Sequence, residues 1–379
     1  MTVNTTISKV DSGLHKTLSF IIAGGGTGGH IFPAISIANA LVKRRPDSKV
    51  LFVGAEGKME MEKVPEAGYK IIGLPIAGYN RSSILKNLSL PFKLIKSFLK
   101  VRKVISNFKP DAVIGVGGYS SFPILRYAQS QNIPTFIHEA NSFAGKSNLI
   151  LGKRASKIFV ATESMNQFFP YSNLVVTGNP VRNIFSEANI IRKEAIEFFG
   201  LKPELPVVFI MGGSLGAKSI NEAIQNNLGV FKKENIQLIW QTGKNYAATG
   251  AKNEEENPGI WTNAFINKME YAYAAADVVV SRAGAMAIAE LCIVAKPVIF
   301  VPYPHAAENH QVANAMNLVN KKAAEMVKDQ DVNDDLVPAI LKLINDKDLC
   351  VVMKENISKM GNTNADETIA SEILKCLGE

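Results

Sequence analysis

Cysteine is scarce in this chain of 379 residues, which has only three. Cys292, Cys350 and Cys376 lack the CxxC spacing of a zinc site, and an odd number of scattered cysteines does not indicate a disulfide framework. We therefore expect neither feature, as is typical of a protein from a reducing compartment.

Long apolar runs are missing as well. No stretch of about 18 uncharged apolar residues occurs, so the sequence predicts no membrane-spanning helix. The first residues, MTVNTTISKVDSGLHK, are polar and lack the apolar centre of a signal peptide. We expect them to form a loose tail on a protein that does not cross a membrane.

Several common motifs of phosphate and metal chemistry are also absent. There is no GxxxxGK[ST] loop, no HExxH helix and no Asp-x-Asp motif after an expected strand. Asp334 and Asp335 fall in a late, surface-type helix, and the spacing of His305 and Glu308 is not that of a zinc protease. The polar segment that begins at His305 fits a sugar-binding loop better than a metal site.

The composition predicts a globular protein, since 47% of the residues are hydrophobic and 20% are charged, and the length suggests two domains. The net charge of +8 is unevenly distributed. Residues 1–180 hold 22 Lys and Arg against 9 Asp and Glu, a net +13, whereas residues 181–379 hold 20 against 25, a net −5. This asymmetry indicates that the first half faces an anionic partner, either nucleic acid or a membrane.

Strands and helices are expected to alternate, and the pattern starts again in the second half. Each half opens with an apolar strand, a glycine-rich turn and a helix, at 18–44 and at 206–224. Such alternation predicts an α/β protein with two Rossmann-like, doubly wound domains, in which ligands bind at the carboxyl ends of parallel strands. We expect a hinge at 178–180 and a ligand cleft between the domains.

The most prominent turn is AGGGTGGHIFPA at 23–34, where a helix is expected to begin at Pro33. A glycine-rich turn between strand and helix directs backbone N–H groups at an anion, so a phosphate or diphosphate is the expected ligand. NAD or FAD is a weaker alternative, because the nearest acidic residue, Glu56, lies farther away than the Rossmann motif requires. His30 in this turn is a candidate general base, phosphate ligand or simple cap.

The second half holds comparable candidates. Ser214 lies in the turn GGSLGAKS and is expected to contact a second phosphate. Arg282 ends a strand, and Glu290 follows on a helix of small and apolar residues. A carboxylate in such a place needs a partner, which is either a sugar diol or a lysine on the helix surface.

A long basic and apolar segment occupies residues 82–108, and we expect Pro91 to break or kink it. After Pro91, most apolar residues fall on one helical face and five Lys and Arg fill the rest. The sequence leaves two readings open, packing of the apolar face on the sheet or docking of the helix on an anionic membrane.

These motifs, in the order GGGTGGHIFPA, GVGGYSSFP, HEAN, GNPVR, GGSLGA, SRAGA…AEL and HAAENHQ, resemble the MurG family of N-acetylglucosaminyltransferases. The resemblance covers nearly the whole chain after residue 16. It implies a GT-B fold with a domain at 17–178 that faces the acceptor and the membrane, a UDP-GlcNAc-binding domain at 179–363, and a final helix at 364–379 that packs back on the first domain.

The resemblance further implies inverting transfer of GlcNAc from UDP-GlcNAc to the 4-hydroxyl of undecaprenyl-pyrophosphoryl-MurNAc-pentapeptide, in peptidoglycan synthesis for cell shape and division. It implies no cofactor and no metal. It places the protein peripherally on the cytoplasmic face of the plasma (inner) membrane, in contact with anionic lipid, wall-synthesis and division proteins, and no nucleic acid.

The resemblance also assigns roles to individual residues, with His30 as the base or an acceptor-site residue. Substrate contacts are implied at Thr27, Gly28, Gly29, Asn141, Arg182, Ser214, Ile266, Ala285, Met286, Ala287, Ile288, Ala289, Glu290 and Gln311, where His310 is an alternative to Gln311. The acceptor diphosphate is implied to lie on Gly25, Gly26, Gly117, Gly118 and Tyr119.

Two alternatives of other kinds stay open. One is another UDP-sugar enzyme of the same fold, such as a UDP-GlcNAc 2-epimerase. The other is a non-catalytic, membrane-recruiting subunit that binds UDP-sugar. A nucleic-acid-binding protein is not supported, because no basic strand with interleaved aromatic residues and no recognition helix is evident.

Overall fold

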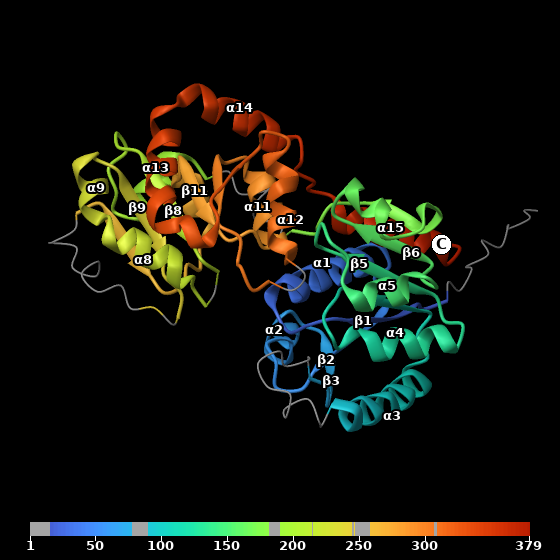
Figure 1. Ribbon diagram of the computed structural model, residues 1–379. Helices are drawn as coiled ribbons and strands as arrows, with labels where there is room; N and C mark the ends of the chain where they lie inside the picture. The colour runs from blue at the N-terminus through green and yellow to red at the C-terminus, as the bar shows by residue number, and fades with distance from the viewer. Residues whose placement is uncertain are drawn as a thin grey trace, which may run out of the picture.

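The computed structural model describes residues 16–77, 90–181, 190–213, 215–244, 246, 258–306 and 309–379. Within these ranges the chain forms two α/β units, each built on a parallel sheet (Figure 1). None of the helices in the described ranges is long and apolar enough to cross a membrane.

The first unit holds a seven-stranded sheet in the described residues, with the order β3-β2-β1-β4-β5-β6-β7. Every pairing in it is parallel. The strands are β1 (Ser19–Ala23), β2 (Lys49–Ala55), β3 (Lys70–Leu74), β4 (Ala112–Gly115), β5 (Thr135–Glu139), β6 (Lys157–Val160) and β7 (Leu174–Val176).

The second unit holds a six-stranded sheet in the described residues, with the order β10-β9-β8-β11-β12-β13, again parallel. Its strands are β8 (Val207–Met211), β9 (Gln237–Gln241), β10 (Ile260–Asn263), β11 (Val278–Ser281), β12 (Val298–Phe300) and β13 (Glu325–Met326). The prediction of two doubly wound Rossmann-like units is confirmed.

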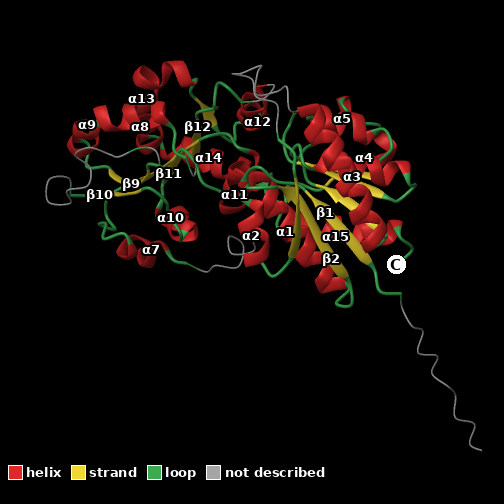
Figure 2. Cartoon of the chain, turned by 90° about the horizontal axis from the view of Figure 1, so that it is seen from below, coloured by secondary structure: helices red, strands yellow, loops and turns green. Residues whose placement is uncertain are grey.

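Helices cover both faces of each sheet (Figure 2), so the central strands are apolar on both sides. In the first unit α3, α4 and α5 cover one face, and α1 and α15 cover the other. The helices are α1 (Gly28–Arg44), α2 (Glu60–Glu66), α3 (Leu90–Phe108), α4 (Ser121–Ser130), α5 (Lys146–Gly152), α7 (Arg192–Phe198), α8 (Lys218–Asn226), α9 (Leu228–Lys233), α10 (Met269–Ala275), α11 (Ala285–Val294), α12 (His310–Val319), α13 (Val332–Asn345), α14 (Lys347–Ser358) and α15 (Ala365–Cys376).

Each sheet reverses its strand order at one place, between β1 and β4 in the first unit and between β8 and β11 in the second. Ligands in open α/β sheets bind at such switch points, beyond the carboxyl ends of the strands. The four strands that flank the two switch points all run into glycine-containing turns, at 24–29, 116–118, 212–216 and 282–284. The topology therefore gives each unit one ligand-facing edge.

The final helix, α15, packs on the first unit although it follows the second in sequence. Ile369 and Ile373 are buried in the same core cluster as Ile22 of β1 and Ile37 of α1. Glu367 of α15 also accepts hydrogen bonds from Lys43 and Arg44 at 2.7 and 2.8 Å.

One expected helix boundary was wrong, the start of α1. Helix α1 begins at Gly28 rather than at Pro33, because Gly28 and Gly29 already form its first turn despite their low helix propensity. Pro91 lies at the second described position of α3, and the break or kink predicted there is not tested, because it depends on the residues before Leu90. Residues 82–89 lie outside the described ranges.

Candidate active site between two glycine-rich turns

A cavity of about 1140 Å³ lies on the ligand-facing edge of the second unit, near several of the predicted site residues. Thr27 from the first glycine-rich turn lines it across from the 211–219 turn and Gln311. Thr27 lies directly before α1, and Lys218, which begins α8, lines the same cavity. Thr27, Ala287 and Gln311, all predicted to bind substrate, therefore face one space.

The turn after β8 requires glycine for close backbone contact. A Cβ at Gly216, which has a φ of +83°, would lie 2.2 Å from the carbonyl oxygen of Thr242. A Cβ at Gly212 would lie 2.3 Å from the backbone nitrogen of Ala217. Gly212, Gly213 and Gly216 therefore leave main-chain groups on the wall of the cavity, which suits a phosphate.

The N-termini of two helices meet this cavity. Gly284 and Ala287 at the start of α11 line it, as do Ala217 and Lys218 at the start of α8. The positive ends of the two helix dipoles make this part of the cavity suitable for an anionic ligand.

Arg282 lines the same cavity, but its guanidinium serves the protein itself. It donates to the carbonyl of Val301 at 3.0 Å and forms an ion pair with Asp329, and it also bonds the hydroxyl of Ser219 at 3.1 Å. These bonds tie β11 to neighbouring elements, so Arg282 shapes the wall of the cavity.

Glu290 of α11 accepts a hydrogen bond at 3.2 Å from the hydroxyl of Tyr273. Ile266 is 3% exposed, and its backbone N–H donates to Gln241 at 2.9 Å. Gln311 accepts from the N–H of Tyr303 at 2.9 Å, which fixes one end of its amide. The side chains of Glu290 and Gln311 are thus held by protein partners.

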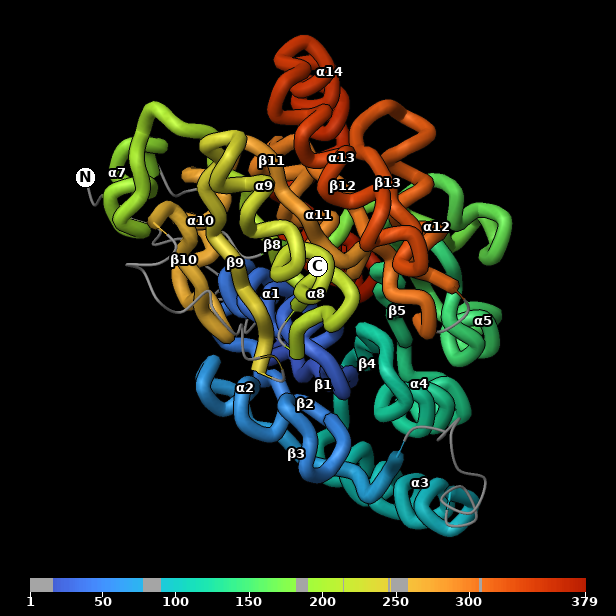
Figure 3. The backbone as a smooth tube through the Cα atoms, turned by 60° about the vertical axis from the view of Figure 1, so that its left-hand side comes forward, coloured from blue at the N-terminus to red at the C-terminus, as the bar shows by residue number. Residues whose placement is uncertain are grey.

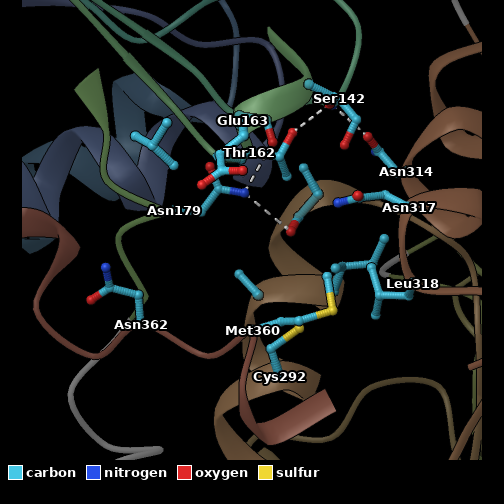
Figure 4. A pocket seen from close by; sticks show the side chains of 18 of the residues that line it. Ser142, Thr162, Glu163, Asn179, Cys292, Asn314, Asn317, Leu318, Met360 and Asn362 are labelled. Carbon is cyan, nitrogen blue, oxygen red and sulfur yellow. Dashed lines mark hydrogen bonds between the residues drawn. The ribbon is translucent and has the colours of Figure 1, made fainter. Parts of the chain in front are cut away.

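The predicted run from Ala285 to Ala289 is divided between two cavities. Ala287 faces the large cavity, whereas Ala285, Ile288 and Ala289 line a second cavity of about 480 Å³ on the hinge side of α11 (Figure 4). Met286 packs against the core of the second unit. Helical periodicity explains this division, since consecutive residues point in different directions.

His30 lies in the first turn of α1, partly buried. Its Nδ1 lies 3.1 Å from the carbonyl oxygen of Gly25, and a carbonyl only accepts, so Nδ1 carries the proton and Nε2 holds the lone pair of the neutral ring. Burial lowers the pKa of His30, opposed by Glu139, by the Gly25 hydrogen bond and by Glu60. The neutral, proton-accepting form is therefore favoured.

The glycines predicted to hold the acceptor diphosphate contact one another and His30. A Cβ at Gly117 would lie 2.8 Å from Nε2 of His30, and one at Gly118 would lie 2.5 Å from the carbonyl oxygen of Gly25. The N–H of Gly26 donates to the carboxylate of Glu60 at 2.9 Å. Tyr119 lies beside Gly26, with its ring carbon Cε1 3.7 Å from the position of a Cβ there.

A polar bridge connects the units at the base of the cleft. Asn314 of α12 accepts from the N–H of Ser142 at 2.8 Å and donates to Oδ1 of Asn141 at 3.2 Å, and Figure 4 shows the Ser142 bond. Asn141 also donates to Glu139, which is 5% exposed. At the hinge, Asn179 donates to the carbonyl of Ala140 at 3.0 Å.

The sequence reading overlooked several of these groups. It did not single out Glu60 or Glu139, both buried carboxylates, or the bridging role of Asn314. For Glu139 the sequence did hold a signal, since it stands two residues before the predicted substrate contact Asn141 in the HEAN motif. Arg182, Ser214 and Glu308 lie outside the described residues, and no group of three or more His, Cys, Asp or Glu able to hold a metal ion occurs among the described ones.

Comparisons with known proteins agree with this architecture. The glycosyltransferase family 28 N-terminal domain matches residues 20–160, and the glycosyltransferase family 28 C-terminal domain matches residues 207–372. The chain is 50% identical over 359 residues to the UDP-N-acetylglucosamine–N-acetylmuramyl-(pentapeptide) pyrophosphoryl-undecaprenol N-acetylglucosamine transferase of Parabacteroides distasonis. That alignment covers 94% of this chain and 98% of the relative.

Solved structures share the fold. The crystal structure of Acinetobacter baumannii MurG is 27% identical, with a TM-score of 0.74, and the match covers 95% of this chain and all of that one. A UDP-GlcNAc 2-epimerase from Neisseria meningitidis matches with a TM-score of 0.65 at 17% identity, over 95% of this chain and all of that one, which shows a common fold only. With both domain matches and the high identity to its relatives, the chain belongs to glycosyltransferase family 28 and, within it, to the MurG family.

Proposed function

We propose that this protein is the inverting glycosyltransferase that moves GlcNAc from UDP-GlcNAc to the 4-hydroxyl of MurNAc-pentapeptide pyrophosphoryl-undecaprenol in peptidoglycan synthesis. The observation that carries this proposal is the 50% identity, over nearly the full length of both chains, to a relative whose name states that transfer. The cleft between two glycine-rich turns supports it, because the reaction needs one site for each diphosphate.

The second unit, proposed to span 179–363, holds the nucleotide. Its diphosphate lies at the 212–216 turn and the N-terminus of α11, with Ser214 as a further contact and Arg182 approaching from the hinge. Ile266 contacts the uracil through its backbone. The start of α11, from Ala285 to Ala289, lies at the phosphate and ribose region with Ala287 facing the cavity, and Glu290 binds the ribose hydroxyls. Gln311 binds GlcNAc from one side, and Thr27, Gly28, Gly29 and Asn141 bind it from the other.

His30 is the proposed general base. An inverting displacement needs a group that takes the proton of the attacking hydroxyl, and a leaving diphosphate that is stabilised by positive dipoles. Nε2 of His30 carries the free lone pair, and a neutral imidazole suits proton abstraction near pH 7. The acceptor diphosphate lies against Gly25, Gly26, Gly117, Gly118 and Tyr119.

The outer face of α3 is the proposed membrane contact. Phe92, Ile95 and Leu99 are 71, 59 and 65% exposed, at the i, i+3 and i+7 spacing of one helical stripe. The opposite face packs on the sheet through Val101, Val104 and Ile105, so one helix combines both readings of the sequence.

Basic residues flank this stripe, including the exposed Lys96, Arg102 and Lys103. In Figures 1 and 3, α3 lies at the end of the first unit remote from the second. An exposed apolar stripe with basic neighbours fits an anionic lipid surface. We therefore place the protein peripherally on the cytoplasmic face of the inner membrane, where other wall-synthesis and division proteins are its candidate partners.

The decisive experiment is transfer of labelled GlcNAc from UDP-GlcNAc to the lipid acceptor or a short-chain analogue. We expect a disaccharide-lipid product, and no turnover of UDP-GlcNAc without acceptor. Acceptor-independent, water-dependent turnover would favour the epimerase reading. Binding of UDP without any transfer would favour a non-catalytic subunit.

A further inference from the structure

Glu60 is a buried carboxylate beside the first glycine-rich turn. It opens α2 and is 0% exposed, and its two oxygens accept hydrogen bonds from two backbone amides. Oε1 accepts from Ala55 at the end of β2, and Oε2 accepts from Gly26, both at 2.9 Å. Among the described residues it forms no ion pair with a Lys, Arg or His. A buried carboxylate held only by amides is costly, which calls for a reason.

The glycines around Glu60 leave room for its side chain. A Cβ at Gly25 would lie 2.1 Å from Oε1 of Glu60, and a Cβ at Gly54 would lie 2.5 Å from its Cγ. Gly25 also has a φ of +154°, which disfavours other residues. At these two positions the missing Cβ makes room for the Glu60 side chain.

One peptide group connects Glu60 to His30. The N–H of Gly26 donates to Glu60, and the carbonyl of the same peptide unit, on Gly25, accepts from Nδ1 of His30 at 3.1 Å. The peptide is planar, so fixing its N–H also fixes the direction of its carbonyl. Gly118 lies so close to the backbone of Gly25 that a Cβ there would be 2.5 Å from the Gly25 carbonyl oxygen, which limits rotation of this peptide.

We propose that Glu60 is a positioning residue for His30, acting through the Gly25–Gly26 peptide group. It holds the Gly25 carbonyl on Nδ1, which keeps the Nδ1–H tautomer and leaves Nε2 as the basic atom. When Nε2 takes the proton of the acceptor hydroxyl, the ring becomes a cation, and the negative charge of Glu60 stabilises it through the polarised peptide. This inference rests on the proposed role of His30 as the base.

Other charged and titratable groups also face His30. Glu139 and His138 approach from β5 and His310 from α12, and Glu139 has a larger effect on the pKa of His30 than Glu60 has. Removing the charge of Glu60 is therefore expected to lower the pKa of His30, while the carboxylate of Glu139 continues to raise it.

The test is Glu60→Gln, which keeps the size and removes the charge. We expect kcat for GlcNAc transfer to fall about 10- to 100-fold, part of the 10²–10⁴ that a general base contributes. The acid limb of the kcat/KM profile should move to lower pH, and so should the titration of the His30 imidazole followed by NMR with labelled histidine. The KM for UDP-GlcNAc should stay unchanged. Glu62→Gln, two residues further along α2 and on its exposed face, is the matched control.

A folded Glu60→Gln variant with unaltered His30 titration and acid limb would overturn the inference, whatever its stability. If this variant does not fold, Glu60→Asp retains the charge but is too short for both amides. It should lower kcat and reduce the Nδ1–H tautomer in the nitrogen spectrum, and an unchanged tautomer would equally contradict the idea. If His30 is not the base, the results differ in a recognisable way. The His30→Gln variant then retains GlcNAc transfer, whereas the Glu60→Gln variant, which keeps His30, still shows a shifted titration of that imidazole.

Discussion

The amide of Asn314 in the second unit donates a hydrogen bond to the amide oxygen of Asn141 in the first, at 3.2 Å. Asn314 is 3% exposed and also bonds Ser142 and the carbonyl of Ala283. The side chain of Asn314 on α12 thus connects two loops, the one that follows β5 in the first unit and the one that follows β11 in the second. This bond couples the geometry of the two halves of the proposed site.

Replacing Asn314 with Leu should uncouple the units. The change leaves the N–H of Ser142 and the amide oxygen of Asn141 without their partner, at a cost of about 1–3 kcal/mol for a buried unsatisfied group. We expect a lower midpoint in urea unfolding and a wider spread of interdomain distances in small-angle scattering. Asn317→Leu, on the same helix, is the control. An unchanged distribution of interdomain distances would show that the hydrogen bonds of Asn314 do not fix the orientation of the two units.

His30→Ala should lose turnover and retain nucleotide binding. The base contributes about 10²–10⁴ in rate, whereas the UDP site lies across the cleft in the second unit. Calorimetry with UDP and the transfer assay separate the two properties. Because the pKa of His30 is lowered, the wild-type acid limb of kcat/KM should lie below the ordinary histidine value of about 6.5. A kcat equal to that of the wild type would remove His30 from catalysis.

Glu290→Ala should raise the KM for UDP-GlcNAc at least about tenfold, since hydrogen bonds to a charged group contribute about 1.5–3 kcal/mol. Glu194→Ala is a suitable control, because Glu194 also accepts from a tyrosine hydroxyl, that of Tyr271, at 2.8 Å on the surface of the second unit. If Glu290→Ala bound UDP-GlcNAc as tightly as the wild type, the ribose role would be wrong.

Ile95→Glu and Leu99→Glu should weaken binding to vesicles that contain anionic phospholipid, with little effect on stability because both side chains are exposed. Co-sedimentation at increasing salt measures the apolar and electrostatic parts separately. Val351→Glu changes a similarly exposed apolar residue on α14 and should leave binding intact. Binding that neither salt nor these α3 substitutions reduce would exclude α3 as the docking surface.

Stability should fall in acid because of His138, which is fully buried near the end of β5. Burial lowers the pKa of His138 to about 4. The unfolded chain binds this proton near pH 6.5, so stability is complete above that pH and declines by up to about 3 kcal/mol as the pH falls to about 4. Urea melts of His138→Gln should show a flatter pH dependence over this window. The exposed His305, replaced with Gln, should leave the slope unchanged.

The sequence predicted the two-sheet architecture because the signals are local. Apolar strands followed by glycine-rich turns, as at 18–29 and 206–216, specify both the strand and the ligand-facing edge. Short elements such as β13 and helix α14 escaped the reading, since two residues carry no periodicity and α14 has an apolar stripe mixed with charges.

The site was predictable only in part, because several of its contacts join segments distant in sequence. Glu60 meets Gly26 across 34 positions, and Ser142 meets Asn314 across 172. A buried carboxylate at residue 60 reads in the sequence as an ordinary charge on a helix. The folded structure shows what the sequence does not, namely that a Cβ at Gly25 or Gly54 would collide with the Glu60 side chain.

The return of α15 to the first unit has a consequence for biosynthesis. Ile369 and Ile373 complete a core around α1, yet the ribosome makes them after the entire second unit. All strands of the second sheet are synthesised before α15, whereas α1 in the first unit keeps an uncovered apolar surface until α15 has been made. A domain that is synthesised first therefore becomes complete last, and a chain interrupted before Ala365 would expose that surface to chaperones and proteases.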